Sequence, residues 1–220
     1  MKMIPLERAQ KEFPFHWVEH PQMHTDRRKQ ILKAHPEVVT LFGTDPMSAV
    51  WIVILAAVLL ALSLVIPRDG WLLATVLAVL VGAPVGLALS ILIHDGGHYL
   101  MFKKKWANDL FMLIANIPIP FPFAMVLRPY HSMHHQFLGE WGRDVDMPTP
   151  AELPFIHSKF WMVKAIWLSL LLPLKNEFTL PMKVKKPLLQ IVNFGIAIAV
   201  NGLIIWATGS LLPTYFMTIS

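Results

Sequence analysis

The 220-residue sequence contains no cysteine. Disulfide bonds, iron–sulfur clusters and zinc sites built on thiolates are therefore excluded within these residues. Any metal that the chain binds must be held by histidine and carboxylate side chains. The sequence has ten histidines, and none of them follows His157.

Charged residues are also scarce, since they make up 15% of the chain while hydrophobic residues make up 55%. This balance is typical of membrane proteins rather than soluble domains. Met47–Ile66 carries no charge over 20 residues, and after the turn at Pro67–Gly70 a second uncharged run, Trp71–Ile93, extends over 23. Because about 20 helical residues span the hydrocarbon core of a bilayer, we expect a membrane-spanning helical hairpin.

The chain has 19 Lys and Arg against 14 Asp and Glu, an excess that could suggest nucleic-acid binding. However, seven of the basic residues precede Met47, and Lys103–Lys105 follow the second apolar run. The hairpin would place both groups on one side of the membrane, which the positive-inside rule makes cytoplasmic. We therefore expect these side chains to face anionic lipid headgroups, with no nucleic acid as partner.

Three further apolar stretches are less regular. Leu110–Val126 carries three prolines at alternate positions, which lack an amide donor, so we expect a re-entrant or broken segment there. Phe160–Pro173 contains a lysine and is expected to lie in the membrane interface. Leu188–Trp206 predicts a third span, in which Asn193 and Asn201 should face other helices rather than lipid.

The predicted fold is all-α, a polytopic helical membrane protein that divides at the first span. Residues 1–46 form an N-terminal cytoplasmic or interfacial segment, with a basic helix that begins near Thr25, and residues 47–220 form the membrane core. Another apolar stretch opens at Leu211, with no charged residue after it. From this ending we expect a core that is truncated at its C terminus.

Five histidines lie in two tight clusters at the ends of apolar segments. The first reads His94-Asp-Gly-Gly-His98, and the second reads His131-Ser-Met-His134-His135. Spacings of three and four place side chains on one face of a helix, so each cluster can direct two or three imidazoles at one point. Imidazole binds iron, copper, nickel and zinc. The pattern predicts a metal centre at the cytoplasmic membrane edge.

A zinc protease is the first alternative, because His-x-x-x-His also occurs in that class. There, a glutamate follows the first histidine and acts as general base, whereas here Asp95 has a side chain one methylene shorter. Five histidines also exceed what a zinc ion with an open coordination position needs. A pair of oxygen-activating irons uses such a ligand set better.

Three carboxylates lie near the clusters. Asp144 and Asp146 follow the second cluster by about ten residues, and Asp95 lies inside the first. Ligating imidazoles usually donate their other nitrogen to a carboxylate or a carbonyl, so all three are candidates to orient a ligand. The alternative for Asp144 and Asp146 is a turn near Pro148, and for Asp95 it is an ion pair with Lys103–Lys105.

The two clusters resemble the first and second histidine boxes of the membrane fatty acid desaturase and hydroxylase superfamily. Within it, Trp17–Pro46, with its His-Pro-Glu-Val-Val and Gly-Thr-Asp-Pro motifs, is similar to the N-terminal region of sphingolipid Δ4-desaturases, the dihydroceramide desaturases. Ala115–Pro122 and Tyr130–Pro148 share this likeness, which extends over nearly the whole chain from Phe15. That family has a third box, of His-x-x-His-His type, well downstream of the second, and this sequence has no counterpart of it.

The resemblance implies the chemistry of a lipid desaturase. The five box histidines would hold part of a two-iron, non-haem site that reacts with O2, with electrons from a haem electron carrier at the membrane surface. The reaction would introduce a trans double bond into the sphinganine backbone and so convert dihydroceramide to ceramide. The enzyme would be an integral, multi-pass protein of the endoplasmic reticulum in a eukaryote, or of the inner membrane in a bacterium.

Two alternatives to the desaturase stay open. A C4-hydroxylase that acts on the same lipid would carry identical boxes. An inactive membrane fragment that binds lipid is the other, since five histidines are fewer than two irons need. A separate C-terminal fragment that supplies the missing ligands would restore the enzyme.

Overall fold

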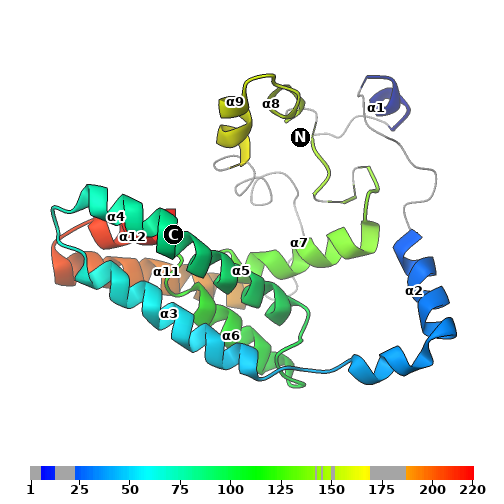
Figure 1. The fold of residues 1–220 in the computed structure, drawn as a ribbon, viewed down its shortest axis with the longest axis horizontal. Coiled ribbons are helices and arrows are strands. Elements are labelled where there is room, and N and C mark those ends of the chain that lie inside the picture. The colour runs from blue at the N-terminus through cyan, green and yellow to red at the C-terminus, as the bar shows by residue number, and fades with distance from the viewer. Residues whose placement is uncertain (1–5, 13–22, 142, 145, 150–151, 169–186) are drawn as a thin grey trace. The chain divides into compact units, whose positions relative to one another are not determined.

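The computed structural model describes residues 6–12, 23–141, 143–144, 146–149, 152–168 and 187–220. All regular elements in these ranges are helical, as the sequence predicts (Figure 1). The chain divides into two compact units, of which the first comprises Met1–Leu41 and Pro129–Lys183 and the second comprises Phe42–Arg128 and Val184–Ser220. The predicted division of the chain at residues 46 and 47 stays a prediction.

Three helical segments in the second unit are long and apolar enough to span a membrane. They are Met47–Val65, Trp71–Gly97 and Pro187–Thr208, which agree with the three predicted spans. In each of the first two segments, only 28% of an 18-residue apolar stretch is buried inside the protein. Most of their apolar surface therefore faces outward, which is the arrangement that contact with lipid requires. The polytopic, all-α prediction is confirmed.

The first two spans form the expected hairpin. Helix α3 (Met47–Val65) is followed by α4 (Trp71–Leu77), a π-helical segment at Ala78–Gly82, and α5 (Ala83–Gly97). The Asp45 amide donates a hydrogen bond of 2.8 Å to the Leu100 carbonyl. The start of α3 and the end of α5 therefore lie at the same end of the hairpin.

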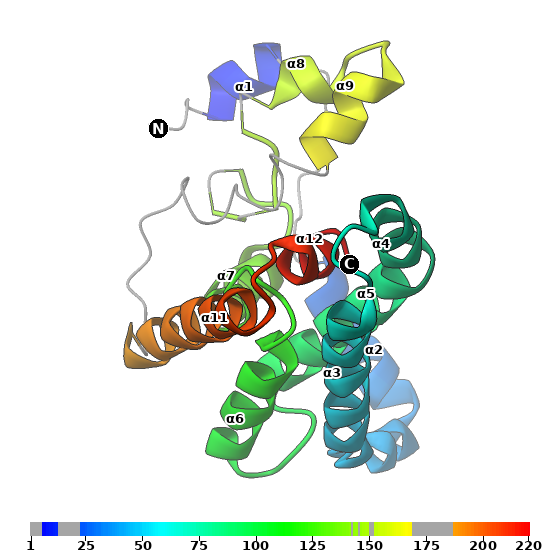
Figure 2. The same ribbon diagram turned by 90° about the vertical axis from the view of Figure 1, so that its left-hand side faces the viewer.

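The core of the second unit lies where α3, α5 and α6 (Lys105–Asn116) pack against one another (Figure 2). Ile52 of α3 and Leu89 and Ile93 of α5 are fully buried there. Helix α12 (Leu212–Ile219) packs against α3 and α4, and it buries Phe216 completely. These apolar contacts hold α5, whose end carries the first histidine cluster, against its neighbouring helices.

The proline-rich stretch is broken, as predicted. Helix α6 ends at Asn116, and α7 (Ala124–Phe137) begins only after the prolines at 118, 120 and 122. The buried Asn116 side chain holds the connection, because its amide donates to the carbonyls of Ile119 and Phe121 at 3.0 Å each. Its oxygen accepts a bond of 2.8 Å from the Ala124 amide. One asparagine therefore supplies partners that the proline-rich backbone lacks.

The loop between α5 and α6 is held by a second buried asparagine. The Asn108 oxygen accepts from the amides of Met101 and Phe102 at 3.1 and 3.3 Å. Its nitrogen donates to the carbonyls of Phe102 and Lys104 at 2.7 and 3.0 Å. The basic loop that follows the first histidine cluster therefore has a defined backbone.

Helix α11 (Pro187–Thr208) contains the two asparagines that were expected to face other helices. For Asn193 this is confirmed, because it is 1% exposed and donates a bond of 3.3 Å to the Asn116 oxygen. Asn201 is half-buried and donates to the Ala197 carbonyl of its own helix.

The first unit contains short helices. They are α1 (Leu6–Glu12), α2 (Met23–Ala34), a 3₁₀ helix at Pro36–Leu41, α8 (Leu153–Ile156) and α9 (Trp161–Ile166). The basic helix predicted near Thr25 is α2, and its basic side chains are exposed. Of the stretch predicted to lie in the interface, α9 covers the first part, and residues 169–173 lie outside the described residues.

Candidate metal centre

The first histidine cluster lies at the end of α5. His94 is in the last turn of the helix, and His98 is the residue that caps it. Their ring centroids are 4.7 Å apart, with an angle of 71° between the rings. Both side chains are half-buried, so their nitrogens remain within reach of a ligand. The spacing of four residues therefore brings the two imidazoles together on one face, as predicted.

The end of α5 is fixed by its backbone. The Leu100 amide bonds to the Asp95 carbonyl, and the Tyr99 amide bonds to the Gly96 carbonyl, each at 3.0 Å. This pair of bonds is the Schellman pattern of helix termination. Tyr99 adopts the left-handed conformation, with φ of 60°, where glycine is usual. His98 is therefore positioned by a helix end whose conformation is unusual for tyrosine, so neighbouring contacts must stabilise that conformation.

The second histidine cluster lies on α7. The Nε2 atoms of His131 and His135 are 2.9 Å apart, and their ring centroids are 4.4 Å apart. Two imidazole nitrogens this close together could both coordinate one metal ion. His134 lies on the same helix, with its ring centroid 5.9 Å from that of His131.

His134 is oriented by the two aspartates that follow the cluster. Its Nδ1 atom lies 2.9 Å from Asp144 Oδ1 and 3.1 Å from Asp146 Oδ2. The Asp144 side chain is only 3% exposed. Its Oδ2 accepts a bond of 2.7 Å from the Gly139 amide, and its Oδ1 accepts one of 2.9 Å from the Asp146 amide. With Nδ1 engaged in this way, Nε2 of His134 is the nitrogen left for a metal.

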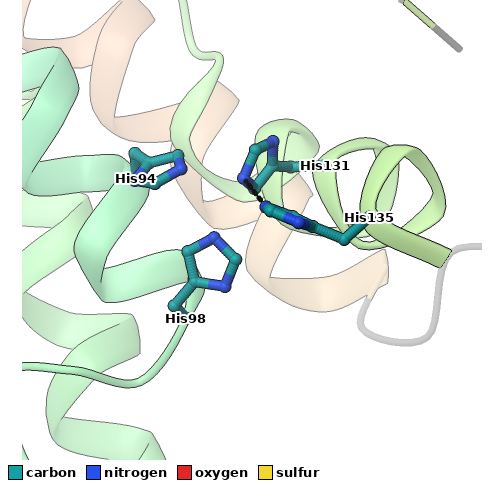
Figure 3. A group of neighbouring side chains, drawn as sticks. All are labelled: His94, His98, His131 and His135. Atoms are coloured by element: carbon teal, nitrogen blue, oxygen red, sulfur yellow. Dashed lines mark hydrogen bonds between the residues drawn. The ribbon is translucent and has the colours of Figure 1, made fainter. Parts of the chain in front are cut away.

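The candidate ligands belong to both units of the chain. Figure 3 draws His94 and His98, from the end of α5 in the second unit, together with His131 and His135, from α7 in the first unit. Within the first unit, one ligand atom each of His134, Asp144 and Asp146 lies within 4.8 Å of the others, so these three could hold a metal ion. The third candidate carboxylate, Asp95, has its Oδ1 3.3 Å from Nδ1 of His94.

The donor set fits a non-haem metal. Each of the four histidines drawn in Figure 3 offers an imidazole nitrogen, a donor that suits iron, copper, nickel or zinc. The carboxylate contacts of His94 and His134 are those that hold a ligating imidazole in one tautomer. The chemistry of the residues present is therefore that of a histidine-rich redox or Lewis-acid site.

One residue at the site was missed by the sequence analysis. Arg128, in the second turn of α7, donates hydrogen bonds to the carbonyls of Gly96 and Gly97 and pairs with Asp109 of α6. The available signal was a lone arginine that closes an apolar stretch three residues before His131. Its partners could not be read from the sequence, because they come from two other helices.

Comparisons with known proteins extend over both clusters. A family described as "Fatty acid desaturase" matches residues 69–219, and one described as "Sphingolipid Delta4-desaturase (DES)" matches residues 11–47. No solved structure matches the chain.

Curated relatives agree with these families. A sphingolipid delta(4)-desaturase of Candida albicans is 39% identical over 149 residues, which are 66% of this chain and 40% of that protein. The sphingolipid delta(4)-desaturase DES1 of Homo sapiens is 34% identical over 185 residues, which are 81% of this chain and 56% of that protein. A Caenorhabditis elegans relative, named as a sphingolipid delta(4)-desaturase/C4-monooxygenase, is 34% identical over 158 residues, 71% of this chain and 43% of that protein. The chain therefore spans about half the length of these relatives, or less.

Proposed function

Because the chain belongs to the fatty acid desaturase family, we propose that it serves the oxygen-dependent Δ4-desaturation of a sphingolipid, the conversion of dihydroceramide to ceramide. One observation carries this proposal. The two histidine boxes stand in a chain whose residues 11–47 match the sphingolipid Δ4-desaturase family. The match to the fatty acid desaturase family alone would not identify the class of lipid substrate. The match of residues 11–47 favours a sphingolipid.

The metal ligands that we propose are His94, His98, His131, His134 and His135. When bound, a pair of non-haem irons would supply the oxidising power to remove hydrogens from unactivated methylenes with O2. The chain's own part is to present neutral imidazoles in a fixed orientation. Asp144 and Asp146 do this for His134 by accepting at its Nδ1, and Asp95 does it for His94.

The substrate would lie with its hydrocarbon in the membrane part of the second unit. A cavity of about 450 Å³ there is lined mainly by apolar side chains, among them Leu59 of α3, Leu87 of α5, and Phe121. It reaches Ser90, which is one helical turn before His94. This position supports a lipid whose chain lies along α5 while its polar end stays near the basic loop that follows the helix.

The finer setting is part of the same proposal. Electrons would come from a haem electron carrier at the cytoplasmic surface. The protein is an integral membrane protein, and we propose the endoplasmic reticulum as its site in a eukaryote or the inner membrane in a bacterium. The exposed basic side chains of α2 support a position beside anionic headgroups.

A C4-hydroxylase is the second candidate. It is favoured by the C. elegans relative, whose name includes a C4-monooxygenase activity. Both reactions begin with removal of hydrogen from the same part of the lipid backbone, and they differ in whether a second hydrogen is removed or an oxygen is added. Product analysis separates them.

The test uses two forms of the protein in cells that lack the activity. One form is the 220-residue chain, and the other is that chain joined to the C-terminal part of the Candida albicans relative that lies beyond the match. Cells receive isotopically labelled dihydroceramide, and the lipids are analysed by mass spectrometry. We expect Δ4-unsaturated product from the joined form and none from the shorter one, since five histidines are too few for two irons.

The control is the joined form with His94→Ala, which should insert normally and yield no product. Hydroxylated lipid without the unsaturated product would favour the second candidate. Absence of both products from a stably inserted joined form would contradict the sphingolipid assignment.

A further inference from the structure

We propose that Arg128 is a positioning residue that fixes the end of α5 and, with it, the two histidines of the first box. The inference rests on the proposed function, in which His94 and His98 bind the metal. It goes beyond that function because it concerns a side chain that would not touch the metal. Four contacts and one ion pair of the Arg128 guanidinium carry it.

The guanidinium caps the end of the helix that carries the first box. Its Nη2 donates a bond of 2.9 Å to the Gly96 carbonyl, and its Nε donates one of 3.2 Å to the Gly97 carbonyl. Both carbonyls lie between His94 and His98 in the sequence. The last carbonyls of a helix lack partners within the helix, and a cation is favourable there because of the helix dipole. Arg128 therefore binds the backbone segment that separates the two ligands.

The charge of Arg128 is balanced inside the protein. Its Nη1 pairs with the Asp109 carboxylate of α6, and the two side chains are 14% and 8% exposed. Its Nη2 also lies 2.9 Å from Met112 Sδ of α6. An ion pair with so little exposure is weak evidence for stability, but loss of either partner is costly. The start of α7 is therefore bound to α6 as well as to α5.

The guanidinium plane has a further contact. Its central carbon lies 4.3 Å from the ring centroid of Tyr99, the residue with φ of 60°. A cation over an aromatic face is attracted by the ring. This contact holds Tyr99 in the conformation that ends α5 directly after His98. Arg128 thereby acts on the position of His98 from two sides, through the Gly97 carbonyl and through the Tyr99 ring.

A lysine at position 128 could not make the same set of contacts. The five contacts of Arg128 use both the planar fork of donors and the flat face of a guanidinium, whereas an ammonium is a point charge with a different geometry. The conservative substitution Arg128→Lys therefore separates positioning from charge alone.

The test measures binding of Co²⁺ to the purified full chain in detergent micelles. The variants are Arg128→Lys and Arg128→Gln, and the control is Thr75→Val, which removes the bond of 2.8 Å between Thr75 and Tyr215 near the other end of the same span. We expect both Arg128 variants to bind Co²⁺ about 10- to 100-fold more weakly, the range typical for loss of a group that orients ligands. Their visible absorption should show fewer histidine ligands, while Thr75→Val keeps the affinity and the spectrum of the parent chain.

Circular dichroism and thermal unfolding separate positioning from folding. If Arg128→Gln fails to fold, Arg128→Lys, which keeps the charge opposite Asp109, decides the question. Unchanged Co²⁺ affinity and spectrum in a folded Arg128→Lys chain would overturn the positioning role and leave the proposed function standing. A parent chain that binds no Co²⁺, or binds it equally well after His98→Ala, would contradict the metal centre itself and the positioning role with it.

Discussion

The Nδ1 atom of His134 lies 2.9 Å from Oδ1 of Asp144, whose side chain is 3% exposed. The same carboxylate accepts bonds from the amides of Gly139 and Asp146, at 2.7 and 2.9 Å. Two backbone amides of the turn thus fix the orientation of the carboxylate that contacts His134. A ligand that is oriented in this way loses little conformational freedom when a metal binds.

Substitution of Asp144 should weaken metal binding. In Asp144→Asn, an amide oxygen can face either His134 or the Gly139 amide, but the amide nitrogen then opposes a donor at the other contact. We expect Co²⁺ affinity about 10- to 100-fold lower, measured by titration of the purified chain.

Asp146→Asn is the matched control for this substitution. Its side chain is 50% exposed, and the amide oxygen of asparagine can replace its contact at 3.1 Å with His134. The affinity should therefore change little. Equal losses in the two variants would show that local charge, rather than orientation of His134, governs binding.

The two glycines of the first box should respond differently to alanine. A Cβ on Gly96 would lie 2.5 Å from Met112 Cγ and 3.2 Å from Met101 Cε, whereas a Cβ on Gly97 meets nothing within 4 Å. Gly96→Ala should therefore destabilise the chain by about 1–3 kcal/mol through overpacking. Gly97→Ala should leave the stability unchanged, because there is room for a Cβ at this position. Both variants keep the backbone carbonyls that accept hydrogen bonds from Arg128. Thermal unfolding in micelles measures the difference, and equal unfolding temperatures would contradict the packing of α5 on α6.

Two asparagines allow a similar comparison. Asn116→Ala removes the partners of the Ile119 and Phe121 carbonyls and of the Ala124 amide, and it should destabilise the chain by about 2 kcal/mol or more. Asn201 has a buried side-chain oxygen with no hydrogen-bond partner among the described residues. Asn201→Leu should thus be neutral or stabilising. Chemical or thermal unfolding of the two variants decides the matter, and a large loss from Asn201→Leu would point to a partner for its oxygen.

Much of the fold follows from the sequence, because long uncharged runs have few alternatives in a membrane. The hairpin of α3 and α5 and the break before α7 depend on local signals, namely helix length and prolines without amide donors. The pairing of His94 with His98 and of His131 with His135 follows from helical periodicity. These features needed no knowledge of tertiary contacts.

Other features of the site depend on contacts between distant residues. Asp109 and Arg128 are 19 positions apart, and each looks like an ordinary charged residue beside an apolar stretch. The sequence indicated that Asp144 could orient a histidine, but it could not say which of the three in the second cluster. The left-handed Tyr99 was also beyond prediction, because glycine or asparagine is usual at that position and the cations that contact its ring, Lys105 and Arg128, come from α6 and α7.

The identity of the metal depends on what the carboxylate beside the first histidine does. In zinc proteases of the His-Glu-x-x-His type, the carboxylate next to the first histidine acts as general base on a metal-bound water. Here, the Asp95 carboxylate lies 3.3 Å from Nδ1 of His94 itself, so it is placed to orient a ligand rather than to activate water. We expect the joined form, expressed with iron and zinc both present, to contain iron by elemental analysis and to consume O2 with lipid substrate. His35→Ala is the control, because this exposed histidine contacts Glu37 and belongs to neither cluster, and it should retain the iron that His98→Ala loses. One equivalent of zinc, with proteolytic activity and no O2 consumption, would favour the protease instead.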